Sequence, residues 1–155
     1  MKQLFCAVLL FAATMPIACA RIGESETQIS ARYGKSAGDI PTPAFGKVRG
    51  FSWSGYIVAV AFVSGLSSME MFAKADQSEM IATEIKNLLQ NAGADEWKAE
   101  PTGKPNWRRW RGENGELIAL YDVGRHFLYV NSKKFYENQG NKIEIEPAEP
   151  PSSES

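Results

Sequence analysis

Residues 55–62, GYIVAVAF, form a short apolar run in which large and small side chains alternate. In an extended chain, side chains two apart share a face, so the larger ones gather on one side and mostly small ones on the other. The larger ones are Tyr56, Val58, Val60 and Phe62. This period of two predicts a β-strand, and we expect its larger side chains to face helices.

Strand signals continue on both sides of this run. The stretch FGKVRGFSW, residues 45–53, precedes it, and Ser64-Gly65 supplies a turn after it. The next stretch, SSMEMFAKA at residues 67–75, alternates again. Three consecutive strands joined by short connections predict an antiparallel meander.

A helix from Ser25 to Tyr33 is expected before this meander. Ser25 can act as the N-cap, and Gln28 stands at the spacing of a capping box. Ile29 and Tyr33 are four residues apart and form one apolar face. Gly34 can take the left-handed conformation that ends many helices.

The second half of the chain repeats this order of signals. In residues 76–93, DQSEMIATEIKNLLQNAG, Asp76 and Glu79 repeat the cap spacing, and Gly93 closes the run. The apolar residues that fall at helical intervals are Ile81, Ile85, Leu88, Leu89 and Ala92. Strand signals follow at residues 107–111, 116–122 and 126–132.

These patterns predict an α+β protein of two helix-plus-antiparallel-meander units, with the helices packed on one face of an antiparallel sheet. Residues 21–136 are expected to form a single domain, which holds an internal repeat of residues 21–75 and 76–136. The residues that we expect to be buried are Val58, Val60, Phe62, Ile85, Leu88, Leu89 and Leu120.

Residues 1–20 have the layout of a secretory signal peptide, with a basic start, an apolar run and small residues before the expected cut after Ala20. We expect a secreted or periplasmic protein without a membrane span. Cys6 and Cys19 both precede the cut, so the mature chain would have no disulfide, which fits a bacterial envelope. The alternative is a lipoprotein anchored through Cys19.

Charge separates the body of the chain from its end. The chain has a net charge of -1, while residues 137–155 hold one lysine against five glutamates, or -4. This proline-, serine- and glutamate-rich stretch is expected to be a disordered acidic tail. The remaining body is only weakly basic, which argues against nucleic-acid binding.

The stretch NWRRWR, residues 106–111, precedes Asn114-Gly115, which predicts a type I′ turn. That turn pairs Trp110 with Ala119 and Arg109 with Leu120. The two tryptophans are three residues apart, so a strand would point them to opposite faces. Trp107 would share its face with the arginines at 109 and 111, and Trp110 with the arginine at 108.

Tryptophan and arginine are common at binding hot spots, so we predict a binding site formed by Trp107, Arg109 and Arg111. In the alternative, one tryptophan fills the core and the arginines are solvated or paired. Their candidate partners are Glu113, Glu116 and Asp122. We expect Trp110 to be structural and Trp107, Arg109 and Arg111 to face water.

Catalytic chemistry has little support in the sequence. His126 is the single histidine, so no multi-histidine metal site can form. The carboxylates fall mostly in caps, turns and a polar helix face, and no spacing favours a catalytic pair. We predict no catalytic residue, no metal and no cofactor, and we leave the question of an enzyme open.

A helix ending in ARYGKS, a linker with prolines and a meander containing YIVAVAF resemble the SmpA/OmlA family of small bacterial envelope lipoproteins. Two such units in tandem resemble the architecture of the secreted β-lactamase inhibitory proteins. The resemblance covers the first half and is weaker in the second. It implies a non-enzymatic protein that presents a sheet surface to another protein.

The expected function is therefore a protein-interaction module of the envelope or periplasm, with another envelope protein as its partner. The alternative is a small hydrolase or a ligand-binding carrier. A deep polar pocket holding His126 with a buried carboxylate would favour this alternative. A shallow surface with exposed tryptophan and arginine would favour the interaction module.

Overall fold

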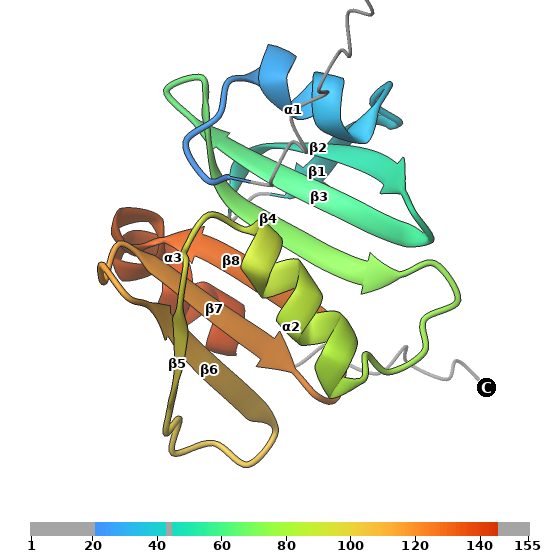
Figure 1. Ribbon diagram of the computed structural model, residues 1–155. Coiled ribbons are helices and arrows are strands. Elements are labelled where there is room, and N and C mark those ends of the chain that lie inside the picture. Colours follow the sequence, from blue (N-terminus) through green and yellow to red (C-terminus); the bar gives the residue numbers. More distant parts are fainter. Residues whose placement is uncertain (1–20, 43–44, 146–155) are drawn as a thin grey trace, which may run out of the picture.

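A computed structural model describes residues 21–42 and 45–145, with side chains described as far as residue 139. This part of the chain forms one eight-stranded antiparallel sheet and three helices (Figure 1). The strand order is β1-β2-β3-β4-β8-β7-β6-β5.

Each half of the chain contributes four strands. The first half holds α1 (Glu26–Tyr33), β1 (Gly38–Thr42), β2 (Gly46–Trp53), β3 (Tyr56–Val63) and β4 (Leu66–Lys74). The second half holds α2 (Ala82–Asn91), β5 (Trp97–Glu100), β6 (Trp107–Gly112), β7 (Leu117–Asp122), β8 (Phe127–Ser132) and α3 (Lys133–Ile145). The internal repeat of residues 21–75 and 76–136 stays a prediction.

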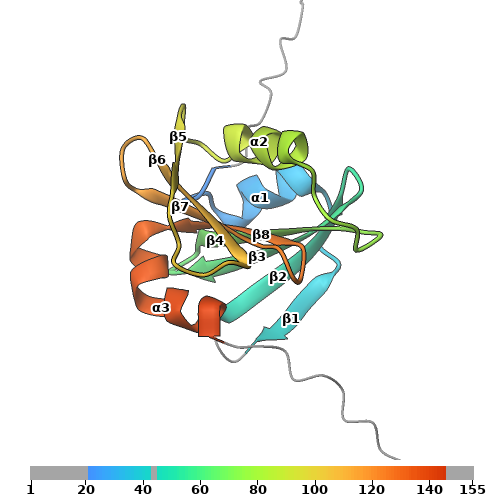
Figure 2. The same ribbon diagram turned by 90° about the horizontal axis from the view of Figure 1, so that it is seen from below.

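The predicted fold class, two helix-plus-meander units, is wrong. Strands β4 and β8 pair from Met69↔Asn131 to Phe72↔Leu128, so the two meanders form one continuous sheet that dominates the fold. The two predicted helices, α1 and α2, lie on one face of the sheet, whereas α3, which the sequence did not reveal, lies on the other (Figure 2).

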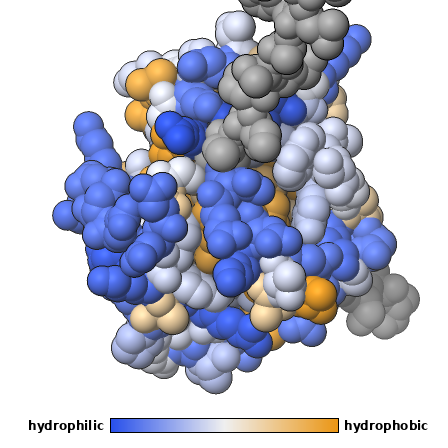
Figure 3. All heavy atoms as spheres, viewed as in Figure 1, coloured by the Kyte–Doolittle hydropathy of each residue, from blue (hydrophilic) through white to orange (hydrophobic). Residues whose placement is uncertain are grey.

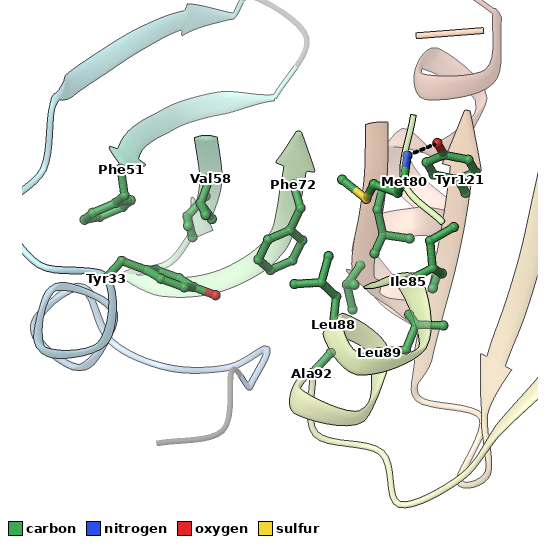
Figure 4. Packing of buried hydrophobic residues seen from close by; sticks show 14 of the residues in the cluster. Tyr33, Phe51, Val58, Phe72, Met80, Ile85, Leu88, Leu89, Ala92 and Tyr121 are labelled. Atoms are coloured by element: carbon green, nitrogen blue, oxygen red, sulfur yellow. Dashed lines mark hydrogen bonds between the residues drawn. The ribbon is translucent and has the colours of Figure 1, made fainter. Parts of the chain in front are cut away.

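The main core lies between the sheet and helices α1 and α2 (Figure 4). Side chains from both halves meet there, such as Phe72 of β4 and Leu88 of α2. A second cluster on the opposite face includes Leu120 and Phe135 of α3. All seven residues predicted to be buried are buried, and the larger side chains of β3 face the helices as expected.

The two helix starts differ from each other. Around α1 the predicted capping box is present, because the Ser25 N–H donates to Oε1 of Gln28 at 2.9 Å. The predicted cap at Asp76 is wrong, because α2 begins at Ala82. Asp76 instead accepts a hydrogen bond of 3.0 Å from the Ser78 N–H in a turn before the helix.

Strands β1 and β5 and helix α3 were not predicted. The acidic tail was expected to begin at residue 137, but α3 continues to Ile145. Phe135 anchors this helix, because it is buried and its ring lies 6.0 Å from the ring of Phe45. The expected signal peptide and residues 146–155 of the expected tail lie outside the described residues. Within the described residues, no helix could cross a membrane.

Candidate functional site

A groove of about 480 Å³ lies between α2 and the β5–β6 hairpin. Strand β5 rises beside α2 at one end of the sheet (Figure 2). In the space-filling view, pale and orange spheres lie between two hydrophilic clusters, one over α2 and one over the hairpin (Figure 3). The groove therefore has an apolar interior and polar rims.

Two tryptophans form the apolar floor. Trp97 and Trp110 are half-buried and pack against the main core cluster. The indole N–H of Trp97 donates a hydrogen bond of 2.7 Å to the carbonyl of Leu89, which holds β5 against the end of α2. The floor is thus held in place by its packing on the core and by this hydrogen bond between β5 and α2.

Helix α2 supplies one wall. Ala82, Lys86 and Gln90 line the groove and are exposed, and they are spaced four residues apart, so they lie along one face of the helix. Ile85 and Leu89 lie deeper, where they join the core. Arg108 of β6 forms part of the opposite wall and is exposed.

The rim carries both signs of charge. Lys86 and Arg108 are cationic, and Asp95 and Glu96 are anionic. Among the described residues, none of these four side chains has an ion-pair partner or a side-chain hydrogen bond. Unpaired charges beside an apolar floor can bind a complementary partner without first breaking an internal pair.

The anionic end has a defined position. A Cβ atom on Gly112 would lie only 3.0 Å from the Cβ of Ala94, so the missing side chain lets the loop pass close to β6. The Glu113 N–H donates a hydrogen bond of 3.0 Å to the carbonyl of Glu96. Because this hydrogen bond places Glu113 beside Glu96, the distance from Arg108 to Glu113 approximates the length of the groove. The two residues are five apart in the chain, which is about 17 Å at the rise of a strand.

The predicted binding residues Trp107, Arg109 and Arg111 lie on the opposite face of the sheet from this groove. The predicted register is confirmed, since Trp110 pairs with Ala119 and Arg109 with Leu120. The ring of Trp107 is half-buried and lies 6.4 Å from the ring of Tyr129. Burial raises the pKa of Tyr129 to about 12.

The two arginines of this predicted site share one carboxylate. Nε of Arg111 donates to Oε1 of Glu100 at 2.7 Å, and Nε of Arg109 lies 3.0 Å from Oε2 in an ion pair without hydrogen-bond geometry. The hydrogen bond from Arg111 holds the pKa of Glu100 below its usual value. The Arg109 guanidinium also lies 5.1 Å from the ring centre of Tyr136.

These contacts differ from both sequence-based interpretations. The side chains of Arg109 and Arg111 are 22% and 35% exposed, so neither simply faces water. Their partner Glu100 lies on β5, a strand that the sequence did not reveal. Asp122, a candidate partner, instead pairs with Arg125 at 2.6 Å. Binding by Trp107, Arg109 and Arg111 stays a prediction.

The turn between β6 and β7 is not type I′. Within it, Gly115 has a positive φ of 73° and Asn114 does not, whereas a type I′ turn needs a positive φ at both central residues. The Gly115 N–H donates a hydrogen bond of 2.8 Å to the Gly112 carbonyl. The strand register was right although the turn type was wrong.

His126 lines a separate hollow of about 500 Å³ on the face opposite α2. Its Nδ1 lies 2.9 Å from the carbonyl of Gln77, so it links the β7–β8 turn to the segment before α2. Ile57, Met71 and Phe127 also line this hollow, and no carboxylate of the described residues does. The arrangement that would favour a hydrolase is not formed around His126.

A buried charged cluster lies beneath α1. Tyr33 and Arg32 of this helix meet Glu70 of β4, and Arg32 also pairs with Glu24. Glu70 is only 2% exposed. The Tyr33 hydrogen bond and the Arg32 ion pair to Glu70 join α1 to the sheet. In the described part of the chain, no group of three or more potential ligands could hold a metal ion.

Comparisons with known proteins give little information. No protein-family model and no curated protein matches the sequence. A solved structure of a cysteine-rich secretory protein from Staphylococcus aureus matches with a TM-score of 0.41 and 7% identity, over 74% of this chain and 44% of that chain. The chain thus spans less than half of that protein, and the likeness is too low to establish a shared fold or function.

Proposed function

We propose that the protein is a non-enzymatic interaction module that binds a segment of another protein in the groove between α2 and the β5–β6 hairpin. The observation that carries this proposal is the pair of half-buried tryptophans beneath four rim charges that have no ion-pair partner in the described part of the chain. Tryptophan at the centre of a contact, with charged residues around it, is the usual composition of a binding hot spot.

The groove is suited to binding because its parts are held in place before a partner arrives. The hydrogen bond from Trp97 to Leu89 fixes the hairpin against α2. Trp110 lies in β6, which is paired on both sides by β5 and β7. A surface that needs little ordering loses less conformational entropy on binding, so more of the contact energy appears as affinity.

The place of action is part of the same proposal. The signal-peptide layout of residues 1–20 supports export to the periplasm or the medium, where another envelope protein would be the partner. A lipoprotein anchored through Cys19 is the alternative. The resemblance to the SmpA/OmlA family and to the β-lactamase inhibitory proteins supports a protein partner and rests on the sequence alone.

A small-ligand carrier is the second candidate function. The groove volume of about 480 Å³ lies within the range of small-molecule sites, and its floor is apolar with polar groups at the rim. A carrier would bind an amphipathic small molecule and would not need a protein partner. The two functions differ in whether a protein is captured through this groove.

Capture from an envelope extract, followed by chemical cross-linking at the groove, tests the proposal. Ala82→Trp should reduce capture, because Ala82 is exposed at the start of α2 and a large ring there would fill the groove. The matched control is the triple alanine variant of Trp107, Arg109 and Arg111, which alters the other face. Loss of capture only in the triple variant would move the binding site to that face and refute the groove.

A further inference from the structure

We propose that the partner segment is an extended peptide with an acidic residue near one end and a basic residue about five positions away. Its acidic end would lie beside Arg108, and its basic end beside Asp95 and Glu96. This inference rests on the proposed function and names the kind of partner that the groove accepts.

The rim charges are separated along the groove. Arg108 pairs across the sheet with Tyr121, whose hydroxyl accepts a hydrogen bond of 3.0 Å from the Met80 N–H just before α2. Arg108 therefore lies near the beginning of α2. Asp95 and Glu96 follow the end of the same helix. One end of the groove is thus cationic, and the other is anionic.

The charge of Lys86 in the middle of the groove and the dipole of helix α2 follow the same order as the rim charges, positive toward the beginning of α2 and negative toward its end. Lys86 lies one turn after Ala82 and one turn before Gln90 on the α2 wall, so its charge extends the cationic half. The helix dipole places partial positive charge at the beginning of α2 and partial negative charge at its end. A partner charged in the opposite sense is therefore favoured at both ends.

Other charges near the groove do not reverse this pattern. Glu79 is exposed near Tyr121, but it does not line the groove. Arg21 lies against Gly93 at the end of α2, also outside the lining. Glu113 is exposed, and its N–H donates to the Glu96 carbonyl, but Glu113 also lies outside the lining.

The size of the groove selects an extended segment. About 17 Å separates the charged ends, which equals about five residues of an extended chain or about eleven of a helix. A helix with its side chains is about 10–12 Å wide, whereas neighbouring strands lie only about 5 Å apart. Over a length of about 17 Å, a groove of about 480 Å³ has a mean width of about 5 Å, so an extended segment can lie within it and a helix could insert only part of its width.

Selection from a library of random dodecapeptides on the purified full chain tests this inference, followed by fluorescence anisotropy of the selected peptides. We expect the selected sequences to share an acidic and a basic residue about five positions apart. Versions with only acidic or only basic ends should bind about tenfold more weakly, since one of their two ends loses a favourable contact and gains a repulsive one.

Charge reversal supplies a variant with a distinct expected result. The double variant Lys86→Glu and Arg108→Glu makes the whole groove anionic, so it should select peptides that are basic at both ends. The mixed-charge peptides should lose about tenfold in affinity for it. Lys35→Glu with Lys98→Glu is the matched control, because both lysines are exposed and neither lines the groove.

The outcomes separate this inference from the function on which it rests. Selected peptides without a common charge order, bound equally by the reversed variant, would overturn the charge assignment and leave the groove as a peptide site. Peptides with acidic and basic residues about eleven positions apart would overturn the extended form. If no selected peptide binds the native protein more tightly than it binds the Ala82→Trp variant, the proposed function is overturned as well.

Discussion

The hydroxyl of Tyr33 donates a hydrogen bond of 2.6 Å to Oε2 of Glu70, and this contact joins α1 to β4 within the core. The other oxygen, Oε1, has no hydrogen-bond partner among the described residues, and Nη1 of Arg32 lies 3.8 Å from it. Burial raises the pKa of Glu70, and the Tyr33 hydrogen bond and the Arg32 charge offset part of this rise.

The stability of the protein should therefore contain a term that weakens as the pH rises. In the unfolded chain a glutamate ionises near pH 4.3, whereas folding holds the Glu70 proton to a higher pH. The contribution is fully present below the unfolded pKa and is lost as the pH rises through the folded pKa. Glu70→Gln should gain stability relative to the native protein from pH 4 to neutrality, as measured by urea unfolding.

Comparing the native protein with Glu70→Gln separates the pH dependence of the unfolding free energy that comes from Glu70 from that of the other carboxylates. Hydrogen bonds lower the pKa values of Glu84 and Glu100, so their contributions change with pH in the opposite direction. Both are retained in the variant and cancel in the difference. A difference in unfolding free energy that stays constant from pH 4 to neutrality would show that Glu70 titrates normally.

Leu89→Ala should lower the unfolding free energy by about 2–5 kcal/mol, because removing a buried leucine leaves a cavity between α2 and the sheet. Leu89 is 4% exposed, and its carbonyl also receives the Trp97 hydrogen bond. Denaturant unfolding measures the change, and Asn87→Ala on the exposed face of α2 is the control. A loss near zero would mean that α2 is not packed on the sheet.

The parts of the fold that could be predicted are those with a local pattern. Alternation revealed β2, β3 and β4, and the same signal with a turn revealed β6, β7 and β8. Strands β1 and β5 are short edge strands without a clear alternation, and β1 contains Pro41. Helix α3 contains Gly140, which lowers helix propensity, and its composition resembles a solvated tail.

The errors about the whole fold have a different origin. The pairing of β4 with β8 joins segments far apart in the sequence, and no local pattern specifies which strands become neighbours. The sequence did place Arg108 and Trp110 on one face of β6, which is correct. The groove also needs α2 as its second wall, and that contact depends on the tertiary fold.

The processed N-terminus is the next prediction. We expect the mature protein to begin at Arg21, because small residues precede the expected cut after Ala20. Intact-mass spectrometry of the exported protein measures this end directly. A diacylated or triacylated Cys19 as the first residue would show instead that the protein is an anchored lipoprotein.

The strength of the ion pair between Arg111 and Glu100 tests whether Arg111, one of the predicted binding residues, has a structural role. A double-mutant cycle of Arg111→Ala and Glu100→Ala should give a coupling of about 0.2–1 kcal/mol in unfolding free energy, as for partly exposed pairs. Because the Glu100 pKa is lowered, this coupling should be present at neutral pH and lost as the pH falls through the folded pKa. Capture of a partner should be unchanged in both single variants. Zero coupling together with weakened capture would return Arg111 to a role in recognition.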